Sequence, residues 1–156
     1  MSDNRVALVT GAGGGLGGAM TEALAVAGYR VAAFDVSEEL AKQTAVKRPE
    51  LADRILPIGG DVRSSVACQD AITQTVEKFG ALHMLVNNAG IGQSSIRDDY
   101  YVDNIMFWDV PDENWENILD TNVKGAFLMA KAAIAHLQNA DWGRIVNVTT
   151  SLDTMI

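Results

Sequence analysis

The sequence holds few of the residues on which disulfide-rich domains, metal sites and nucleic-acid interfaces depend. Of its 156 residues one is cysteine, Cys68, and two are histidine. A single cysteine excludes an internal disulfide and fits a reducing compartment, and without a Cys or His cluster no metal site is indicated. Only 12 Lys and Arg oppose 20 Asp and Glu, a net charge of −8. Nucleic acid is therefore not expected as a partner, because binding its phosphates needs a basic face.

Long apolar runs are also missing. The first apolar run spans only Val6 to Val9, which is too short for a secretory signal, and no later run approaches the ~18 residues of a membrane span. The composition is that of a globular chain, with 48% apolar and 21% charged residues. We therefore expect a cytoplasmic protein with no membrane partner and one domain over residues 1–156.

Short apolar runs alternate with segments in which apolar residues recur every three or four positions. The apolar runs predict strands over residues 6–9, 31–34, 54–58, 84–86 and 145–148. The periodic segments predict helices over about 16–27, from a Ser37 cap to about Lys47, from a cap at Ser64 or Ser65 to Gly80, and along an apolar stripe from Trp115 to Leu137.

This alternation of short apolar strands and helices is typical of a parallel sheet that is covered on both faces. Right-handed crossovers leave few topologies, and the expected fold class is α/β, a doubly wound parallel sheet of Rossmann-like type. Five strands are present, and the six-strand dinucleotide fold would still lack its last one. We therefore expect that the C-terminal part of the fold is missing and that strand 145–148 lies at an apolar edge that promotes self-association.

A glycine-rich turn from Thr10 to Gly17 joins the first strand to the first helix. Two registers compete, G-x-G-x-x-G at residues 13–18 and T-G-x-x-x-G-x-G at residues 10–17. Because the predicted strand ends at Val9, the turn begins immediately afterwards, which favours the second register. Glycines let a backbone approach a ligand closely, and a helix N-terminus offers free N–H groups to a pyrophosphate.

An acidic residue closes the second predicted strand. Asp35 lies about 20 residues beyond the turn, where dinucleotide folds place an acid that accepts hydrogen bonds from the adenosine ribose. The same carboxylate repels a 2′-phosphate, and the neighbouring Val36 and Ser37 are uncharged. We therefore expect NAD in preference to NADP as the cofactor; the alternative is a solvated aspartate in a turn.

Two further polar groups follow predicted strands, at the carboxyl edge where such sheets bind ligands. Asp61 and Val62 follow the third strand, and they either meet an adenine ring or form a turn. The run from Asn87 to Gly90 follows the fourth strand. Paired asparagines can satisfy backbone groups where strands separate, which favours sheet reinforcement for Asn87, and Gly90 permits close approach of a ligand.

One polar residue, Asn122, interrupts the apolar stripe of the long helix. A buried amide needs partners, because leaving it unsatisfied costs ~1–3 kcal/mol. It is either a core asparagine bonded to neighbouring backbone, which spacing alone favours, or part of an ordered-water site near the ligand edge. Thr149, Thr150 and Ser151 follow the fifth strand, where their hydroxyls either bond a substrate carbonyl or form a turn.

Together these motifs resemble the short-chain dehydrogenase/reductase family, over nearly the whole chain. The resemblance rests on T-G-x-x-x-G-x-G at 10–17, an acid at 35, D-V at 61–62, N-N-A-G at 87–90, T-N-V at 121–123 and G-R-I-V-N-V at 143–148. It implies an NAD(P)-dependent oxidoreductase that transfers hydride between nicotinamide and an alcohol or carbonyl substrate. It also implies a small-molecule alcohol or ketone as partner and a homo-oligomer at full length.

The resemblance further assigns roles to single residues. It implies that the pyrophosphate is held by Gly11, Gly15, Leu16 and Gly17, and the ribose by Asp35. Asp61 and Val62 are implied to flank the adenine. Asn88, Ala89 and Gly90 are implied to line the cofactor cleft. Asn122 is implied to hold a water in the proton relay. The active-site hydroxyl, which polarises the reacting carbonyl, falls on Thr150 or Ser151.

The sequence departs from the family pattern in two further features. The family's Tyr-x-x-x-Lys pair, in which the tyrosine transfers the proton, does not occur before the sequence ends at Ile156. The stretch from Gly90 to Trp115 is longer than usual, and its aromatic residues indicate either a substrate lid or a packed surface loop. A non-catalytic dinucleotide-binding module, such as a redox sensor, is therefore the alternative to an enzyme.

We predict little or no dehydrogenase turnover by the 156-residue chain alone, because the proton-transferring pair is missing from it. The measurement is NADH formation by the purified chain with a panel of alcohols. Robust NAD-linked turnover in that assay would contradict the prediction.

Overall fold

A computed structural model describes residues 4–149, and in it five parallel strands form one sheet. The strands are β1 (Val6–Thr10), β2 (Arg30–Asp35), β3 (Ile55–Gly59), β4 (Met84–Asn87) and β5 (Arg144–Asn147). Their order is β3-β2-β1-β4-β5, and every neighbouring pair is parallel. The predicted α/β class is confirmed, and β5 lies at one edge. Pro57 is tolerated because β3 forms the other edge.

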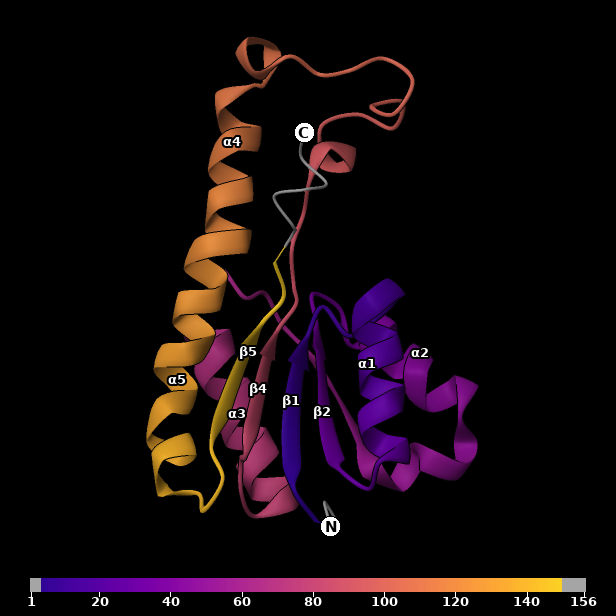
Figure 1. The fold of residues 1–156 in the computed structure, drawn as a ribbon, viewed down its shortest axis with the longest axis vertical. Helices are drawn as coiled ribbons and strands as arrows, with labels where there is room; N and C mark the ends of the chain where they lie inside the picture. Colours follow the sequence, from indigo (N-terminus) through magenta and orange to yellow (C-terminus); the bar gives the residue numbers. More distant parts are fainter. Residues whose placement is uncertain (1–3, 150–156) are drawn as a thin grey trace.

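Helices cover both faces of the sheet (Figure 1). They are α1 (Gly15–Val26), α2 (Glu38–Lys47), α3 (Ser65–Phe79), α4 (Asp112–Leu119) and α5 (Ala126–Asn139), with a π-helical turn over Asp120–Gly125 and short 3-10 turns over Pro49–Arg54, Gln93–Ser95 and Phe107–Asp109. α1 and α2 pack on one face, and α3 and α5 pack together on the other. All strands point the same way, so their carboxyl ends meet at one edge, the upper edge in Figure 1.

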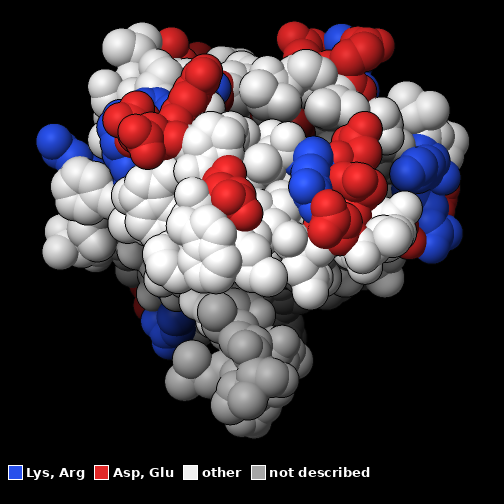
Figure 2. Space-filling view, turned by 90° about the horizontal axis from the view of Figure 1, so that it is seen from above, with Lys and Arg blue, Asp and Glu red and all other residues white. Residues whose placement is uncertain are grey.

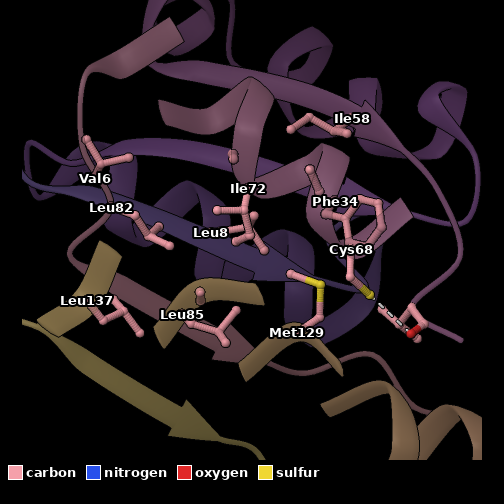
Figure 3. Close-up of a cluster of buried hydrophobic side chains, with 14 residues drawn as sticks. Val6, Leu8, Phe34, Ile58, Cys68, Ile72, Leu82, Leu85, Met129 and Leu137 are labelled. Atoms are coloured by element: carbon pink, nitrogen blue, oxygen red, sulfur yellow. Dashed lines mark hydrogen bonds between the residues drawn. The ribbon is translucent and has the colours of Figure 1, made fainter. Parts of the chain in front are cut away.

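Alternate residues of the strands feed two apolar cores. On β1, Val6 and Leu8 face the core under α3 and α5, whereas Ala7 and Val9 face the core under α1 and α2. Figure 3 shows the first core, in which Phe34 and Met129 lie near Cys68 at one end of the cluster. All of these strand residues are buried, which explains their uninterrupted apolar character in the sequence.

Cys68 belongs to this first core. Its thiol is fully buried and donates to the carbonyl oxygen of Val62 at 3.2 Å (Figure 3). Burial raises the pKa of Cys68 to about 11. The side chain therefore packs as a thiol at neutral pH.

The structure identifies the N-cap residues of α2 and α3 as Ser37 and Ser64. Ser37 Oγ accepts from the N–H of Leu40 at 3.1 Å, and Ser64 Oγ accepts from the N–H of Ala67 at 3.3 Å. Ser64 is therefore the cap of α3, and Ser65 is its first helical residue. Gly80 ends α3 with φ +83°, a left-handed conformation that favours glycine.

The prediction for the long helix is wrong in two respects. It is not one regular helix, because the π-helical turn separates α4 from α5. Much of the predicted apolar stripe also faces outward: Phe127 is 62% exposed, and Asn122, expected to be buried, is exposed too. Leu137, the last residue of the stripe, is buried, and it shares the buried side of α5 with Met129 and Ala133.

The reason for the outward stripe is visible in Figure 1, where α4 extends beyond the carboxyl edge of the sheet. Within residues 4–149 no strand lies beneath that part of the helix to cover its apolar residues. None of the helices in the described part combines the length and apolarity that crossing a membrane requires.

Candidate functional site

The carboxyl ends of β1 and β4 are joined through the side chain of Thr10. Its hydroxyl oxygen accepts from the N–H groups of Asn88 at 3.0 Å and Ala89 at 2.9 Å, and the hydroxyl donates to the carbonyl oxygen of Val86 at 3.4 Å. Thr10 is 1% exposed. In the sequence Thr10 is only the first letter of a turn motif, and this role could not be predicted from it because the contacts cross from one strand to another.

Asn88 secures the same junction with its side chain. Its Nδ2 donates to the carbonyl oxygens of Thr10 at 2.9 Å and Gly11 at 3.2 Å. The amide therefore holds the beginning of the glycine turn, besides lining the cleft above β4. Asn87, the residue before it, donates to Asn147 Oδ1 on β5 at 2.9 Å, and this bond confirms the sheet reinforcement expected of it.

The glycine turn is shaped by close backbone contact at its two ends. Gly11 follows β1 with φ +65°, and a side chain there would press on the backbone of Ala89. At Gly17 a Cβ atom would overlap the carbonyl oxygen of Gly11. The first turn of α1 can therefore lie against the end of β1 only because both residues lack side chains.

The middle of the turn is open. A Cβ atom built on Gly14 or on Gly15 would meet no other atom within 4 Å. No side chain caps the N-terminus of α1. Leu16, in the first turn, is exposed. Uncapped amides of a helix start, beside open space, are a suitable place for the oxygens of a phosphate group.

Asp35 connects this turn to the neighbouring strand. It ends β2, and its Oδ2 accepts from the N–H of Gly13 at 2.8 Å. The carboxylate also lines a cleft of about 400 Å³ that opens beside the turn. The turn and the acid, separated by 22 residues in the sequence, thus share one site.

The residues that follow β3 form one wall of this cleft. The whole cleft is lined by Gly11, Phe34, Asp35, Val36, Gly60, Asp61, Val62, Arg63, Ala89, Gly90, Ile91, Ser95, Asn114, Asn117 and Thr121. Asp61 and Val62, which were candidates for an adenine contact or a turn, therefore do lie at the cleft. Val62 is buried, and its side chain lies against Gly125 of the π-helical turn.

Arg63 was not singled out in the sequence, although it is the residue that engages Asp61. Its guanidinium donates to both carboxylate oxygens, at distances from 2.6 to 3.1 Å, and its Nη1 donates to Asn117 Oδ1 at 2.9 Å. The hydrogen bonds from Arg63 lower the pKa of Asp61 from its ordinary value. Asp61 therefore remains a carboxylate at neutral pH, paired with this guanidinium.

Asn122 lies in the π-helical turn and holds the segment that follows β4. Its Oδ1 accepts from the N–H of Ile91 at 2.9 Å, and its Nδ2 donates to the carbonyl oxygen of the same residue at 2.8 Å. The first of the two alternatives expected such bonds to backbone, but it also expected a buried core residue, and Asn122 is exposed. π-helical turns are frequent at functional sites, because the wider turn displaces backbone groups from the regular ladder.

A second, larger hollow of about 990 Å³ extends from Asn88 and Asn122 along β4, β5 and the start of α5. Thr149 lines it. Thr150 and Ser151, the candidates for the active-site hydroxyl, lie outside the described residues.

The long segment over residues 91–111 is held by ion pairs within it and by one hydrogen bond from α4. Arg97 pairs with Asp99 at 3.0 Å and with Asp103 at 2.8 Å, and Asn114 Nδ2 donates to the carbonyl oxygen of Ser95 at 3.1 Å. The aromatic side chains of Tyr101, Phe107 and Trp108 are exposed. A packed surface loop would bury these three rings beneath the segment, and they are not buried there.

Figure 2 looks down on the carboxyl edge. Most basic side chains on this face lie beside acidic ones, and uncharged surface separates the patches. The face does not present the continuous basic area that a phosphate backbone needs.

Comparison with known proteins agrees with this geometry. A family model described as short chain dehydrogenase matches residues 5–155. The chain belongs to the short-chain dehydrogenase family. Among curated family members it is 36% identical over 148 residues to a 2-(R)-hydroxypropyl-CoM dehydrogenase of Xanthobacter autotrophicus, covering 94% of this chain and 56% of that one. It is 37% identical over 153 residues to a cis-1,2-dihydrobenzene-1,2-diol dehydrogenase of Pseudomonas putida, covering 96% and 51%.

Solved structures of the family superpose on the same sheet. A 3-ketoacyl-(acyl-carrier-protein) reductase from Brucella melitensis, complexed with NADH, is 29% identical and has a TM-score of 0.84 over 96% of this chain and 58% of that one. A short-chain alcohol dehydrogenase structure from Sinorhizobium meliloti is 36% identical, with a TM-score of 0.79 over 93% and 54%. The chain thus spans about half the length of the family members it matches.

We predict that Gly17→Ala destabilises the chain, because its methyl group must displace the Gly11 carbonyl; overpacking of this kind costs ~1–3 kcal/mol or more. The measurement is the urea midpoint of unfolding. Gly14→Ala is the matched control, since it adds the same methyl group to the same turn in open space and at an extended φ of −174°. Equal midpoints for the two variants would contradict the prediction.

Proposed function

We propose that this chain is the cofactor-binding part of an oxidoreductase that transfers hydride between NAD and an alcohol or carbonyl substrate. The observation that carries the proposal is the hydrogen bond from Gly13 N–H to Asp35 at 2.8 Å. It brings an open, uncapped helix start and a carboxylate to one cleft. A dinucleotide offers those two groups a pyrophosphate and a ribose diol.

The residues present fit such a cofactor. In the proposal the phosphates lie at the first turn of α1, the adenosine ribose at Asp35 and the base in the cleft of about 400 Å³. The residues proposed to hold the cofactor are Gly11, Gly15, Leu16, Gly17, Asp35, Asp61, Val62, Asn88, Ala89 and Gly90. Asn88 acts mainly by fixing the turn, because its amide nitrogen already bonds Thr10 and Gly11.

NAD is proposed over NADP on grounds of charge. A 2′-phosphate would meet the Asp35 carboxylate, which repels it. A cation that could compensate has to come from a nearby basic side chain, and the arginine that lines this cleft, Arg63, is already paired with Asp61. The acidic site therefore favours the ribose with two free hydroxyls.

The nicotinamide supplies the hydride chemistry when it is bound, and the chain contributes positioning. We propose that the larger hollow beside Asn122 admits the nicotinamide end and the substrate. Asn122 fixes the segment at Ile91 that forms one wall of it. The proposed active-site hydroxyl, from Thr150 or Ser151, comes shortly after β5 in the sequence and would orient the reacting carbonyl.

The substrate class proposed is a small hydroxylated or carbonyl compound. The names of the two curated family members, a hydroxypropyl-CoM dehydrogenase and a dihydrodiol dehydrogenase, describe oxidation of secondary alcohols on unrelated carbon skeletons. This variety supports the reaction class and leaves the skeleton open.

A homo-oligomer is proposed from the outward apolar stripe. Trp115, Leu119, Val123 and Phe127 are exposed at intervals of four residues along α4, the π-helical turn and α5. Such a row on one helix face is a typical surface for association with a second copy, because pairing two such faces removes them both from water.

We predict that Phe127→Glu reduces self-association of the chain, because it places a charge in the middle of this row. The measurement is sedimentation velocity at several protein concentrations. Val46→Glu on α2, where the valine is also well exposed, is the control and should sediment like the wild type. A wild-type chain that sediments as a monomer throughout would contradict the proposal.

We predict that the wild-type chain binds NADH at least tenfold more tightly than NADPH. Asp35→Asn should weaken NADH binding about tenfold and abolish the discrimination, because a charge-assisted hydrogen bond contributes ~1.5–3 kcal/mol. The measurement is nicotinamide fluorescence on titration. Asp53→Asn, on the exposed turn before β3, is the charge-matched control.

Equal wild-type affinity for NADH and NADPH would refute the NAD preference alone. Absence of binding for both would refute the proposed function.

A further inference from the structure

The carboxylate of Asp61 is fully engaged by one neighbour. Its Oδ1 accepts from the backbone N–H of Arg63 at 2.9 Å and from Nε at 3.1 Å, and its Oδ2 accepts from Nε at 2.9 Å and from Nη2 at 2.6 Å. A carboxylate offers about four lone-pair sites. A base amino group that approached Asp61 would therefore have to displace the guanidinium.

The guanidinium itself is held at both ends. Asp61 binds it along one edge, and Asn117 on α4 binds its Nη1 at 2.9 Å. Hydrogen bonds to a guanidinium lie in its plane, so these contacts fix the plane and leave its flat faces without a hydrogen-bonding function. Arg63 lines the cleft of about 400 Å³ that Asp35 also lines, and its side chain is 41% exposed.

We propose that Arg63, rather than Asp61, recognises the base of the dinucleotide, by stacking the flat face of its guanidinium on the ring. Asp61 and Asn117 are positioning residues that hold this plane. The inference rests on the proposed function, because the base reaches the cleft when Asp35 holds the adjoining ribose. A flat, fixed guanidinium is well suited to an aromatic ring, since stacking combines dispersion with the attraction of a cation for a π face.

This arrangement has a consequence for specificity. Stacking uses the π face that every purine has, whereas a carboxylate acceptor requires the 6-amino group of adenine. The site should therefore accept a dinucleotide in which hypoxanthine, with a carbonyl at that position, replaces adenine. Direct recognition by Asp61 would reject it, because two oxygen acceptors would face each other.

The test compares three reduced ligands by fluorescence titration of the 156-residue chain: NADH, its hypoxanthine analogue, and nicotinamide mononucleotide, which lacks the adenosine part and therefore has no purine base. Wild-type affinities for NADH and the hypoxanthine analogue should agree within about threefold. Arg63→Lys retains the charge but loses the plane, and it should weaken both dinucleotides about tenfold, because stacking on the base is lost. Its affinity for the mononucleotide should not change.

Two further variants separate positioning from direct contact. Asp61→Asn and Asn117→Ala should each weaken NADH and the hypoxanthine analogue by the same factor, because both act through Arg63. Arg54→Lys, at the opposite end of β3, is the arginine control and should change nothing. A variant that fails to fold is recognised by loss of the mononucleotide, and in that case the wild-type comparison of the two bases still decides.

The inference is overturned if the wild type prefers NADH tenfold or more and Asp61→Asn removes that preference, or if Arg63→Lys binds NADH like the wild type. Either result leaves the proposed function intact. If the wild type binds neither dinucleotide, the proposed function fails and the inference with it.

Discussion

The hydroxyl of Thr10 is the contact on which the geometry of the site depends. β1 and β4 are neighbours in the sheet, and beyond their ends the two chains diverge into a turn and a loop. Thr10 accepts two backbone N–H groups from the β4 side and donates one hydrogen bond back, while Asn88 holds the turn in the opposite direction. Because these groups are largely removed from water, a missing partner would cost ~1–3 kcal/mol for each orphaned donor. The glycine turn and the floor of the cleft therefore share one support.

Much of the fold could be predicted from the sequence because its signals are local. Strands buried on both faces are short and uniformly apolar, glycines mark the turn, and serine caps mark helix starts. The placement of Asp35 at the glycine turn was also predictable, since both follow adjacent strands at the same edge. Arg63 was not predictable in the same way. A sequence shows an acid and an arginine two residues apart as two solvated charges, whereas its bond to Asn117, 54 residues away, depends on where α4 passes.

The error along the long helix has a different origin. Hydropathy periodicity identifies an apolar face but does not say what covers it. Here the covered side includes Gly125 and Ala133, small residues that contribute little to an apolar signal and allow α5 to approach its neighbours closely. Met129 and Leu137 are covered as well, whereas Trp115, Leu119 and Phe127 lie on the exposed side. The π-helical turn could not be read from the sequence either, because nothing in residues 120–125 distinguishes it from a regular helical turn.

The burial of Cys68 makes this residue a natural probe of local unfolding. The Cys68 thiol, on the buried side of α3, has a pKa of about 11. It is therefore almost entirely protonated at neutral pH, and its burial makes it inaccessible to electrophiles. Since the sequence has no second cysteine, any alkylation must follow an opening that exposes this one sulfur. The rate of that reaction would measure how often the core between the sheet and helices α3 and α5 opens to solvent, without any engineered label.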